Sequence, residues 1–82
     1  MAHLKLFAAL REAAGTTSDE IDAPDLATFL TEARRRYGRE FARSLAFASV
    51  MVNREPVDLE QAASIALNPS DEVALLPPVS GG

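Results

Sequence analysis

The chain has 82 residues, of which 48% are hydrophobic and 24% are charged, a composition typical of one small domain. It contains no cysteine, which excludes disulfides, thiolate metal sites and cysteine nucleophiles, and its one histidine, His3, cannot build a metal site alone. No apolar run approaches the length of a membrane span and no signal segment opens the sequence, so we expect a cytosolic protein without a membrane partner.

The net charge of −4 is distributed unevenly. Residues 1–53 carry seven basic and seven acidic side chains, whereas residues 54–82 carry one basic and five acidic ones. This pattern argues against nucleic acid as a partner and favours a basic protein surface facing the acidic half. Acids that serve solubility are the alternative. With so few catalytic side chain types, the chain is not expected to be an enzyme by itself.

The first part of the chain predicts two strands around a short helix. Residues 2–7 alternate polar and apolar side chains, the pattern of a half-buried strand. Residues 8–14 form a short helical pattern that Gly15 ends. Residues 16–22 are β-branched and polar, which suits an exposed edge strand.

Residues 26–37 predict the main helix, with Asp25 as its N-cap and Gly38 after its end. Its apolar stripe consists of Leu26, Phe29, Leu30, Ala33 and Tyr37. Five arginines lie in or after this helix: Arg34, Arg35, Arg36, Arg39 and Arg43. Three of them fall in the last turn, where the helix dipole favours cations, so we interpret them as solvated charges. A patch for an anion or a partner is the alternative.

The rest of the chain predicts two further strands and short connections. From the weaker pattern of residues 40–48 we expect Phe41, Leu45 and Phe47 to pack onto the core from a short helix or loop. Residues 49–53 alternate like a strand. Turns are predicted at residues 53–56 and 68–71, with a short strand at Val57 and a helical turn at 59–63 that Asp58 and Gln61 cap. Residues 72–76 are apolar on both faces, which predicts a central strand or one with a face reserved for a partner.

This order of elements predicts one α+β domain over residues 1–76, a mixed sheet crossed by one main helix. Residues 77–82 are expected to leave the domain as an extended tail. Pro77 and Pro78 stop the last strand, because proline cannot donate a hydrogen bond to the sheet.

The tail ends in Gly81 and Gly82, which have no side chains. A terminal carboxylate on such a tail can enter a channel too narrow for any side chain and act there as the reacting group. A frayed end without function is the alternative.

Three segments carry a resemblance to a known family. They are residues 6–12 (LFAALRE), residues 52–53 (VN) and residues 71–82 (DEVALLPPVSGG). Together they resemble the small subunit of molybdopterin synthase, the MoaD-type sulfur carrier, over the whole chain. Ser70 departs from the family, which commonly has glycine before Asp-Glu, so the resemblance leaves the geometry of that turn open.

The resemblance implies a ubiquitin-like β-grasp fold, with the first and last strands adjacent and parallel at the sheet centre. It implies that an E1-like adenylating enzyme joins Gly82 to AMP, using ATP and magnesium. A sulfur donor protein then converts the anhydride into a thiocarboxylate. The tail enters the large subunit of molybdopterin synthase, where the sulfur builds the dithiolene of molybdopterin. No permanently bound cofactor is implied for the carrier.

The same resemblance implies roles for particular residues. Gly82 reacts, Gly81 gives clearance, and the residues that position the tail are Ser80, Val79, Pro78 and Pro77. We expect an apolar docking patch formed by Leu76, Phe7 and Pro56, with Arg11 as a charge at its rim. A core position is the alternative for Phe7, and an ordinary helix-surface charge is the alternative for Arg11.

Other functions share the same tail. They are a thiazole-forming carrier of the thiamine pathway, a carrier for cysteine synthesis, and a ubiquitin-like modifier that forms an isopeptide bond through Gly82. A different class is a binding module that never activates its terminus. Deletion of Gly81 and Gly82 would leave that module functional and inactivate every carrier.

Overall fold

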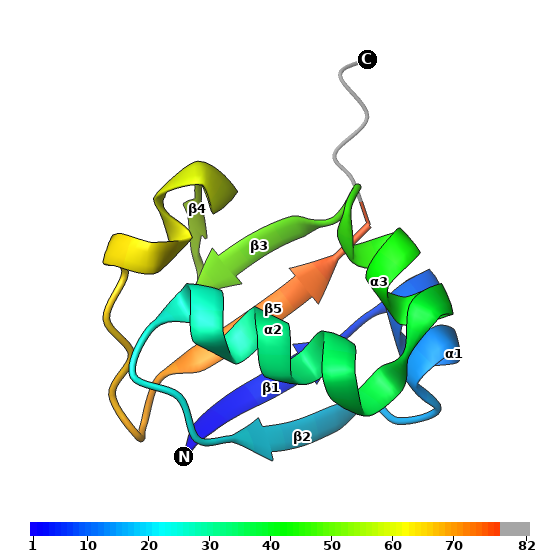
Figure 1. Ribbon diagram of the computed structural model, residues 1–82, viewed down its shortest axis with the longest axis horizontal. Helices are drawn as coiled ribbons and strands as arrows, with labels where there is room; N and C mark the ends of the chain where they lie inside the picture. Colours follow the sequence, from blue (N-terminus) through cyan, green and yellow to red (C-terminus); the bar gives the residue numbers. More distant parts are fainter. Residues whose placement is uncertain (78–82) are drawn as a thin grey trace.

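A computed structural model describes residues 1–77 of the chain, and the predicted tail positions 78–82 lie outside the described residues. The elements follow the order β1 (Ala2–Leu6), α1 (Ala8–Ala14), β2 (Ser18–Ile21), α2 (Leu26–Tyr37), α3 (Arg39–Leu45), β3 (Ser49–Val52), β4 (Glu55–Val57), a 3-10 helix η1 (Leu59–Ser64) and β5 (Glu72–Leu76) (Figure 1). No helix within residues 1–77 is long and apolar enough to cross a membrane.

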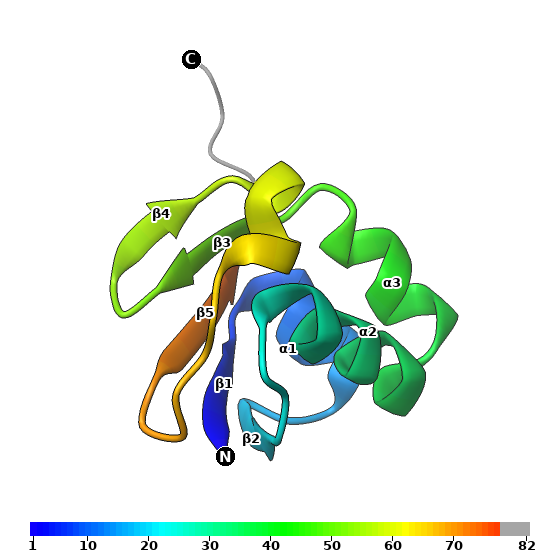
Figure 2. The same cartoon turned by 60° about the vertical axis from the view of Figure 1, so that its left-hand side comes forward.

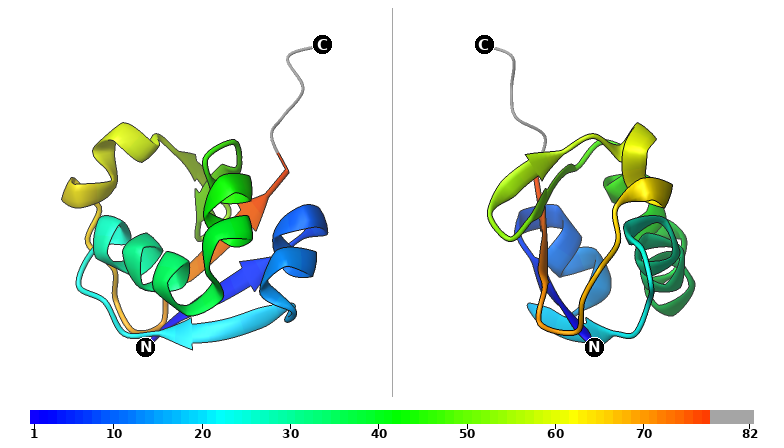
Figure 3. Two further views of the ribbon diagram at one scale, coloured as in Figure 1. Left: turned by 45° about the vertical axis from the view of Figure 1, so that its right-hand side comes forward. Right: turned by 90° about the vertical axis from the view of Figure 1, so that its left-hand side faces the viewer.

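The five strands form one mixed sheet in the order β2-β1-β5-β3-β4. The central pair, β1 and β5, is parallel, with His3 beside Glu72 and Leu6 beside Leu75, and the other pairs are antiparallel. The helices cover one face of this sheet (Figures 2 and 3). The strand adjacency expected from the resemblance is therefore confirmed, and the other face of the sheet is open over the described residues.

The two predicted helices have the expected boundaries because their end signals are local. α1 ends at Gly15, which adopts a left-handed φ of 75° and donates its N–H to the Arg11 carbonyl. α2 begins at Asp25, whose carboxylate accepts a hydrogen bond from the Thr28 N–H at 2.7 Å. It ends at Gly38, where φ is 86°.

The core lies between α2, α3 and the covered face of the sheet. It is built from Ala2, Leu4, Leu6, Leu10, Ile21, Leu26, Phe29, Leu30, Ala33, Phe41, Leu45, Val50, Ala62, Leu67, Val73 and Leu75. Phe41 and Leu45 are fully buried, as expected, but the prediction for Phe47 was wrong, since 75% of its surface is exposed. α3 ends at Leu45 and the chain then turns, the Phe47 N–H donating to the Ser44 carbonyl, which leaves the ring outside.

The prediction of a turn at residues 53–56 was partly wrong. Only Asn53 and Arg54 form the turn, both with positive φ (51° and 69°), the geometry that fits a two-residue hairpin. Pro56 lies within β4 opposite Met51, which an edge strand tolerates because the missing N–H can face solvent.

The turn before β5 forms without glycine at Ser70, the position that departs from the family. The Asp71 N–H donates to the Asn68 carbonyl at 3.0 Å, and the Asn68 N–H donates to the Asp71 carboxylate at 2.8 Å. Ser70 does not adopt a positive φ. Hydrogen bonds from the Asn68 N–H and the Asn53 amide lower the pKa of Asp71.

Two of the predicted arginines take part in a surface ion-pair network. Arg35 and Arg36 both bind Glu32, at 2.6 and 2.9 Å, and Arg36 also lies 3.0 Å from Asp19. Hydrogen bonds from Arg35 and Arg36 lower the pKa of Glu32 to about 2, and the bond from Arg35 has the largest effect. The Tyr37 hydroxyl donates to the Asp19 carboxylate. For these two arginines the network favours paired surface charges over an anion-binding patch.

Candidate functional site at the end of the central strand

The two central strands, β1 and β5, are parallel, so their C-terminal ends lie side by side at one end of the sheet. The Phe7 N–H donates to the Leu75 carbonyl at 3.2 Å, so the backbone pairing continues one residue beyond β1. β5 ends at Leu76, and Pro77 after it is exposed. The chain segment that leads to the predicted tail therefore begins at the middle of the sheet, where neighbouring strands on both sides fix its position.

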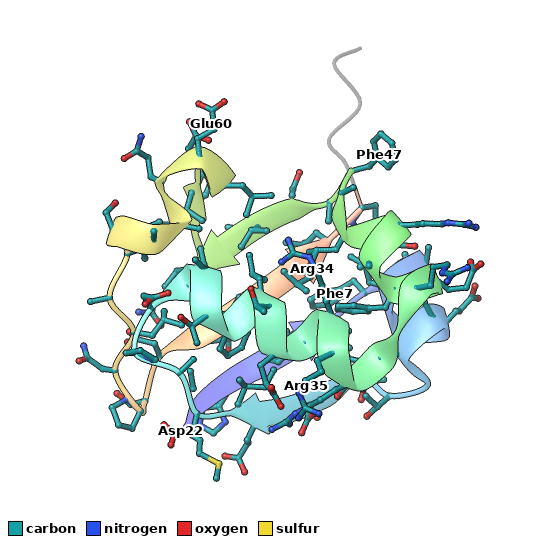
Figure 4. All side chains as sticks on the ribbon, in the orientation of Figure 1. Phe7, Asp22, Arg34, Arg35, Phe47 and Glu60 are labelled. Carbon is teal, nitrogen blue, oxygen red and sulfur yellow. The ribbon has the colours of Figure 1, made fainter. Side chains whose placement is uncertain are left out.

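An apolar groove of about 180 Å³ lies beside this strand end. It is lined by Phe7, Ala8, Ala9, Leu10, Ser44, Phe47, Leu76 and Pro77. Phe7 is 42% exposed and Phe47 is 75% exposed, so two aromatic rings contact solvent there. Figure 4 shows Phe47 extending outward from the connection between α3 and β3. We name these eight residues the tail-root groove.

A sharp bend of the backbone brings Phe7 to the tail-root groove. Ala8 adopts a left-handed φ of 52°, which turns the chain from β1 directly into α1. This conformation costs a non-glycine residue about 1–2 kcal/mol. Phe7 itself keeps extended geometry, with φ −130° and ψ 150°, so it follows the alternation of β1 and lies on the face opposite Leu6.

Leu76 lies on the open face of the sheet. Val73 and Leu75 are fully buried on the covered face, and alternation places Ala74 and Leu76 on the other one. Met51 pairs with Ala74 on one side and with Pro56 on the other, so all three share this open face. Leu76 and Pro56 therefore belong to one surface. Pro56 lies two strand spacings, about 10 Å, across the sheet from β5, at the level of Ala74 and two residues before Leu76.

The other half of the open face is charged. His3 Nδ1 lies 3.3 Å from a Glu20 carboxylate oxygen, and Lys5 Nζ lies 3.1 Å from a Glu72 carboxylate oxygen. The open face thus divides into an apolar part near the end of β5 and a paired-charge part near its start. An apolar part of this kind, rimmed by charged residues, is typical of a protein-binding surface.

The structure brings some of the predicted site residues together and separates others. Phe7, Leu76 and Pro77 line the tail-root groove, and exposed Arg11 lines a neighbouring hollow that Phe7 shares. Pro56 lies on the same open face but outside the groove. The remaining predicted residues, Pro78, Val79, Ser80, Gly81 and Gly82, lie outside the described residues.

Phe47 is the site residue that the sequence analysis missed. It was expected in the core, yet it forms one wall of the tail-root groove. The spacing of the apolar residues could have indicated this position. Phe41 and Leu45 are four residues apart and share one helix face, whereas Phe47 does not continue that spacing.

The described residues of this site are mainly apolar. Within residues 1–77, no three histidine, cysteine, aspartate or glutamate side chains gather as a metal site would require. The tail-root groove is apolar apart from the Ser44 hydroxyl. What this arrangement can do is offer an apolar surface to a partner beside Pro77, the last described residue.

Comparison with known proteins identifies first the fold of this chain and then its family. SAMP1 of Haloferax volcanii, a small archaeal modifier protein, superposes with a TM-score of 0.79 at 28% identity, covering 99% of this chain and 98% of that one. With this match the fold is that of the ubiquitin-like β-grasp proteins. The ThiS family matches residues 4–82, and the chain belongs to the ThiS family.

Two curated relatives are both named molybdopterin synthase sulfur carrier subunit. The protein from Pyrenophora tritici-repentis is 38% identical over 78 residues, which cover 93% of this chain and 84% of that one. The protein from Dictyostelium discoideum is 35% identical over 80 residues, which cover 94% of this chain and 91% of that one. The resemblance to MoaD-type sulfur carriers is confirmed.

Proposed function

We propose that the chain is the sulfur-carrier subunit of a molybdopterin synthase and that its Gly82 carboxylate carries the sulfur. The observation that carries this proposal is the match of the ThiS family through residue 82, directly after a central strand that ends beside an apolar groove. Both curated relatives are named for the same role.

The chemistry follows from the reactivity of a carboxylate. A carboxylate is a poor electrophile, so an E1-like enzyme first joins Gly82 to AMP with ATP and magnesium, and a sulfur donor then displaces AMP to give the thiocarboxylate. Gly81 and Gly82 give the clearance that a narrow channel requires. Because activation consumes ATP, a cytosolic location belongs to the same proposal.

The partners are an activating enzyme and the large synthase subunit. Both must hold the carrier firmly while its terminus reacts, and the apolar part of the open face with the tail-root groove supports such docking. In this arrangement Leu76 and Phe7 form the centre of the contact, Pro56 extends it, and Arg11 lies at its rim.

Intact-mass spectrometry tests the proposal. The chain is incubated with an E1-like activating enzyme of this family, ATP, magnesium and a sulfur donor, beside a variant that lacks Gly82. We expect a gain equal to the replacement of one oxygen by sulfur in the full chain and none in the truncated one. An unchanged mass, with an activating enzyme that modifies its own carrier in parallel, would refute the sulfur-carrier proposal.

A second function, protein modification, is favoured by one observation. The structural match to SAMP1 reaches 28% identity, and that protein is named as a modifier. A modifier would transfer Gly82 to a lysine amine of another protein rather than pass on sulfur. Incubating the activated carrier with the large subunit and with a lysate separates the two, because sulfur transfer regenerates the free carrier whereas modification yields covalent conjugates.

A further inference from the structure

The sheet ends in two edge strands, β4 and β2, and an edge strand presents unpaired backbone groups to which another chain can add a strand. In β4, the two-residue hairpin turn makes Val52 and Glu55 a hydrogen-bonded pair, which leaves Pro56 as the residue whose backbone faces outward. Proline has no N–H, so the outward side of β4 lacks a donor. Strand addition through outward N–H groups is therefore restricted to β2.

Ser18 and Glu20 are the residues of β2 whose backbone groups face away from the sheet. In an antiparallel pair only alternate residues exchange hydrogen bonds with the neighbouring strand. His3 lies opposite Glu20, and its N–H donates to the Asp71 carbonyl, on the other side of β1. The N–H and C=O of Glu20 therefore point outward, and by the same alternation so do those of Ser18.

Side chains of the chain itself occupy these outward groups. The Glu20 N–H donates to Asp19 Oδ1 at 2.7 Å, and Arg36 Nη1 donates to the Glu20 carbonyl at 2.9 Å. Thr16 Oγ1 donates to the Ser18 carbonyl at 3.0 Å, and the Ser18 N–H donates to the same oxygen at 3.5 Å. Both outward-facing residues of β2 thus have their N–H and C=O groups engaged before any other strand arrives.

The main helix holds the two partners of Glu20 in place. Arg36 Nη1 also lies 3.0 Å from an Asp19 carboxylate oxygen, and Arg36 Nε donates to Glu32 at 2.9 Å. The Tyr37 hydroxyl donates to the same Asp19 carboxylate. We name Asp19 and Arg36 the edge pair. A strand that approaches Glu20 has to break the bonds of the edge pair before it can pair with this residue.

We propose that the edge pair closes β2 against strand addition by a second copy of this chain. β2 is self-complementary for such addition, because a twofold axis at Asp19 places Ser18 of one copy opposite Glu20 of the other, in both directions. The same axis sets two Asp19 carboxylates opposite each other, and like charges at that position destabilise the pairing.

The consequence is a monomeric chain whose open sheet face stays available to partners. This inference concerns the sheet edge and does not rest on the proposed function.

Two arginine variants of the same helix test the proposal. Arg35→Ala and Arg36→Ala each remove one positive charge and one partner of Glu32, but of the two arginines Arg36 alone bonds β2. Sedimentation equilibrium of the full chain measures self-association. We expect it to be at least about fivefold stronger in Arg36→Ala than in Arg35→Ala, because the Glu20 carbonyl is then free to pair. Equal self-association of the two folded variants would overturn the proposal.

A combined variant opens the edge further. Asp19→Ala with Arg36→Ala frees both outward groups of Glu20 and removes one charge of each sign, so the net charge stays at −4. We expect this variant to self-associate more strongly than Arg36→Ala, and a folded variant that stays monomeric would contradict the proposal.

Adding Glu20→Pro to these variants separates edge pairing from a general loss of stability. Proline removes the outward N–H of β2 but restores none of the bonds that the other substitutions remove. We expect the variants with Glu20→Pro to be monomeric like the wild type, with thermal unfolding to establish that each is folded. Self-association that persists with Glu20→Pro would place the contact on another surface and refute the role of β2. If the combined variant does not fold, Arg36→Ala with and without Glu20→Pro gives the same comparison.

Discussion

At the scale of single residues, one hydrogen bond makes the stability of the domain depend on pH. The hydrogen bond from the Tyr37 hydroxyl is the largest cause of the lowered pKa of Asp19, and burial together with this bond raises the pKa of Tyr37 to about 12. Asp19 is on β2 and Tyr37 ends α2, so the bond joins the edge strand to the main helix.

We predict that Tyr37→Phe lowers the free energy of unfolding by about 1 kcal/mol at neutral pH. A lowered carboxyl pKa stabilises the fold above its ordinary value of 3.8, and this contribution is lost as the pH falls through the folded-state value. A raised tyrosine pKa stabilises the fold below 10.0, and this contribution is lost as the pH rises towards 12. Urea unfolding from pH 2 to 11 should therefore give a flatter profile for the variant at both ends; parallel profiles would contradict the prediction.

The two phenylalanines of the α3 region should differ sharply on substitution. Phe41 is fully buried, with its ring 5.2 Å from that of Tyr37, whereas Phe47 is mostly exposed. We predict that Phe41→Ala lowers the free energy of unfolding by about 3–5 kcal/mol. Phe47→Ala should change it by less than about 0.5 kcal/mol. Thermal unfolding of both variants checks this, and a large loss from Phe47→Ala would mean that its ring packs inward.

At the scale of elements, the main helix depends on its N-cap. The Asp25 carboxylate accepts from the Thr28 N–H, and Asp25 also bridges to Ala66 in the chain that follows η1. We predict that Asp25→Ala lowers the free energy of unfolding by about 1 kcal/mol, since one N–H at the helix start loses its partner. Asp25→Asn is the control and should retain most of this stability, because asparagine caps equally well. Denaturant unfolding should place the asparagine variant near wild type; a loss as large as that of alanine would argue against the cap.

Local signals explain why the helix boundaries were predictable from the sequence. Gly15, Asp25 and Gly38 act through their own backbone or side chain within one helical turn, so neighbouring residues suffice to place α1 and α2. The prediction that Pro56 belongs to a turn was wrong for the opposite reason. Its tolerance within a strand depends on β4 being at the sheet edge, which no local pattern reveals.

The candidate site likewise has one part that local sequence predicts and another that depends on tertiary packing. Residues 71–82 carried the functional prediction, because the closing motif is contiguous in sequence. The tail-root groove was only partly predictable, since α1, α3 and β5 meet there through tertiary packing. Phe47 illustrates the difference: hydrophobicity favours the core, but the end of α3 decides which way the ring points.

At the scale of the whole molecule, the sheet separates a face that builds the core from a face that is open for docking. The open face is itself divided, with Leu76, Met51 and Pro56 in its apolar part and the His3–Glu20 and Lys5–Glu72 pairs in the charged part. Residues at the centre of an apolar contact usually dominate binding, whereas charges at its rim contribute little. Substitutions in the two parts should therefore affect partner binding very differently.

We predict that Leu76→Glu weakens binding to the large subunit of molybdopterin synthase at least about tenfold, because it places an unpaired charge in the centre of the contact. His3 lies in the charged part of the same face, and its substitution His3→Gln should leave the affinity unchanged. Isothermal titration calorimetry measures both, with thermal unfolding to establish that each variant is folded. Equal affinities for wild type and a folded Leu76→Glu would show that the apolar part does not dock this partner. A loss confined to His3→Gln would instead assign the contact to the charged part, in which case the carrier would bind through the start of β5 rather than beside its tail.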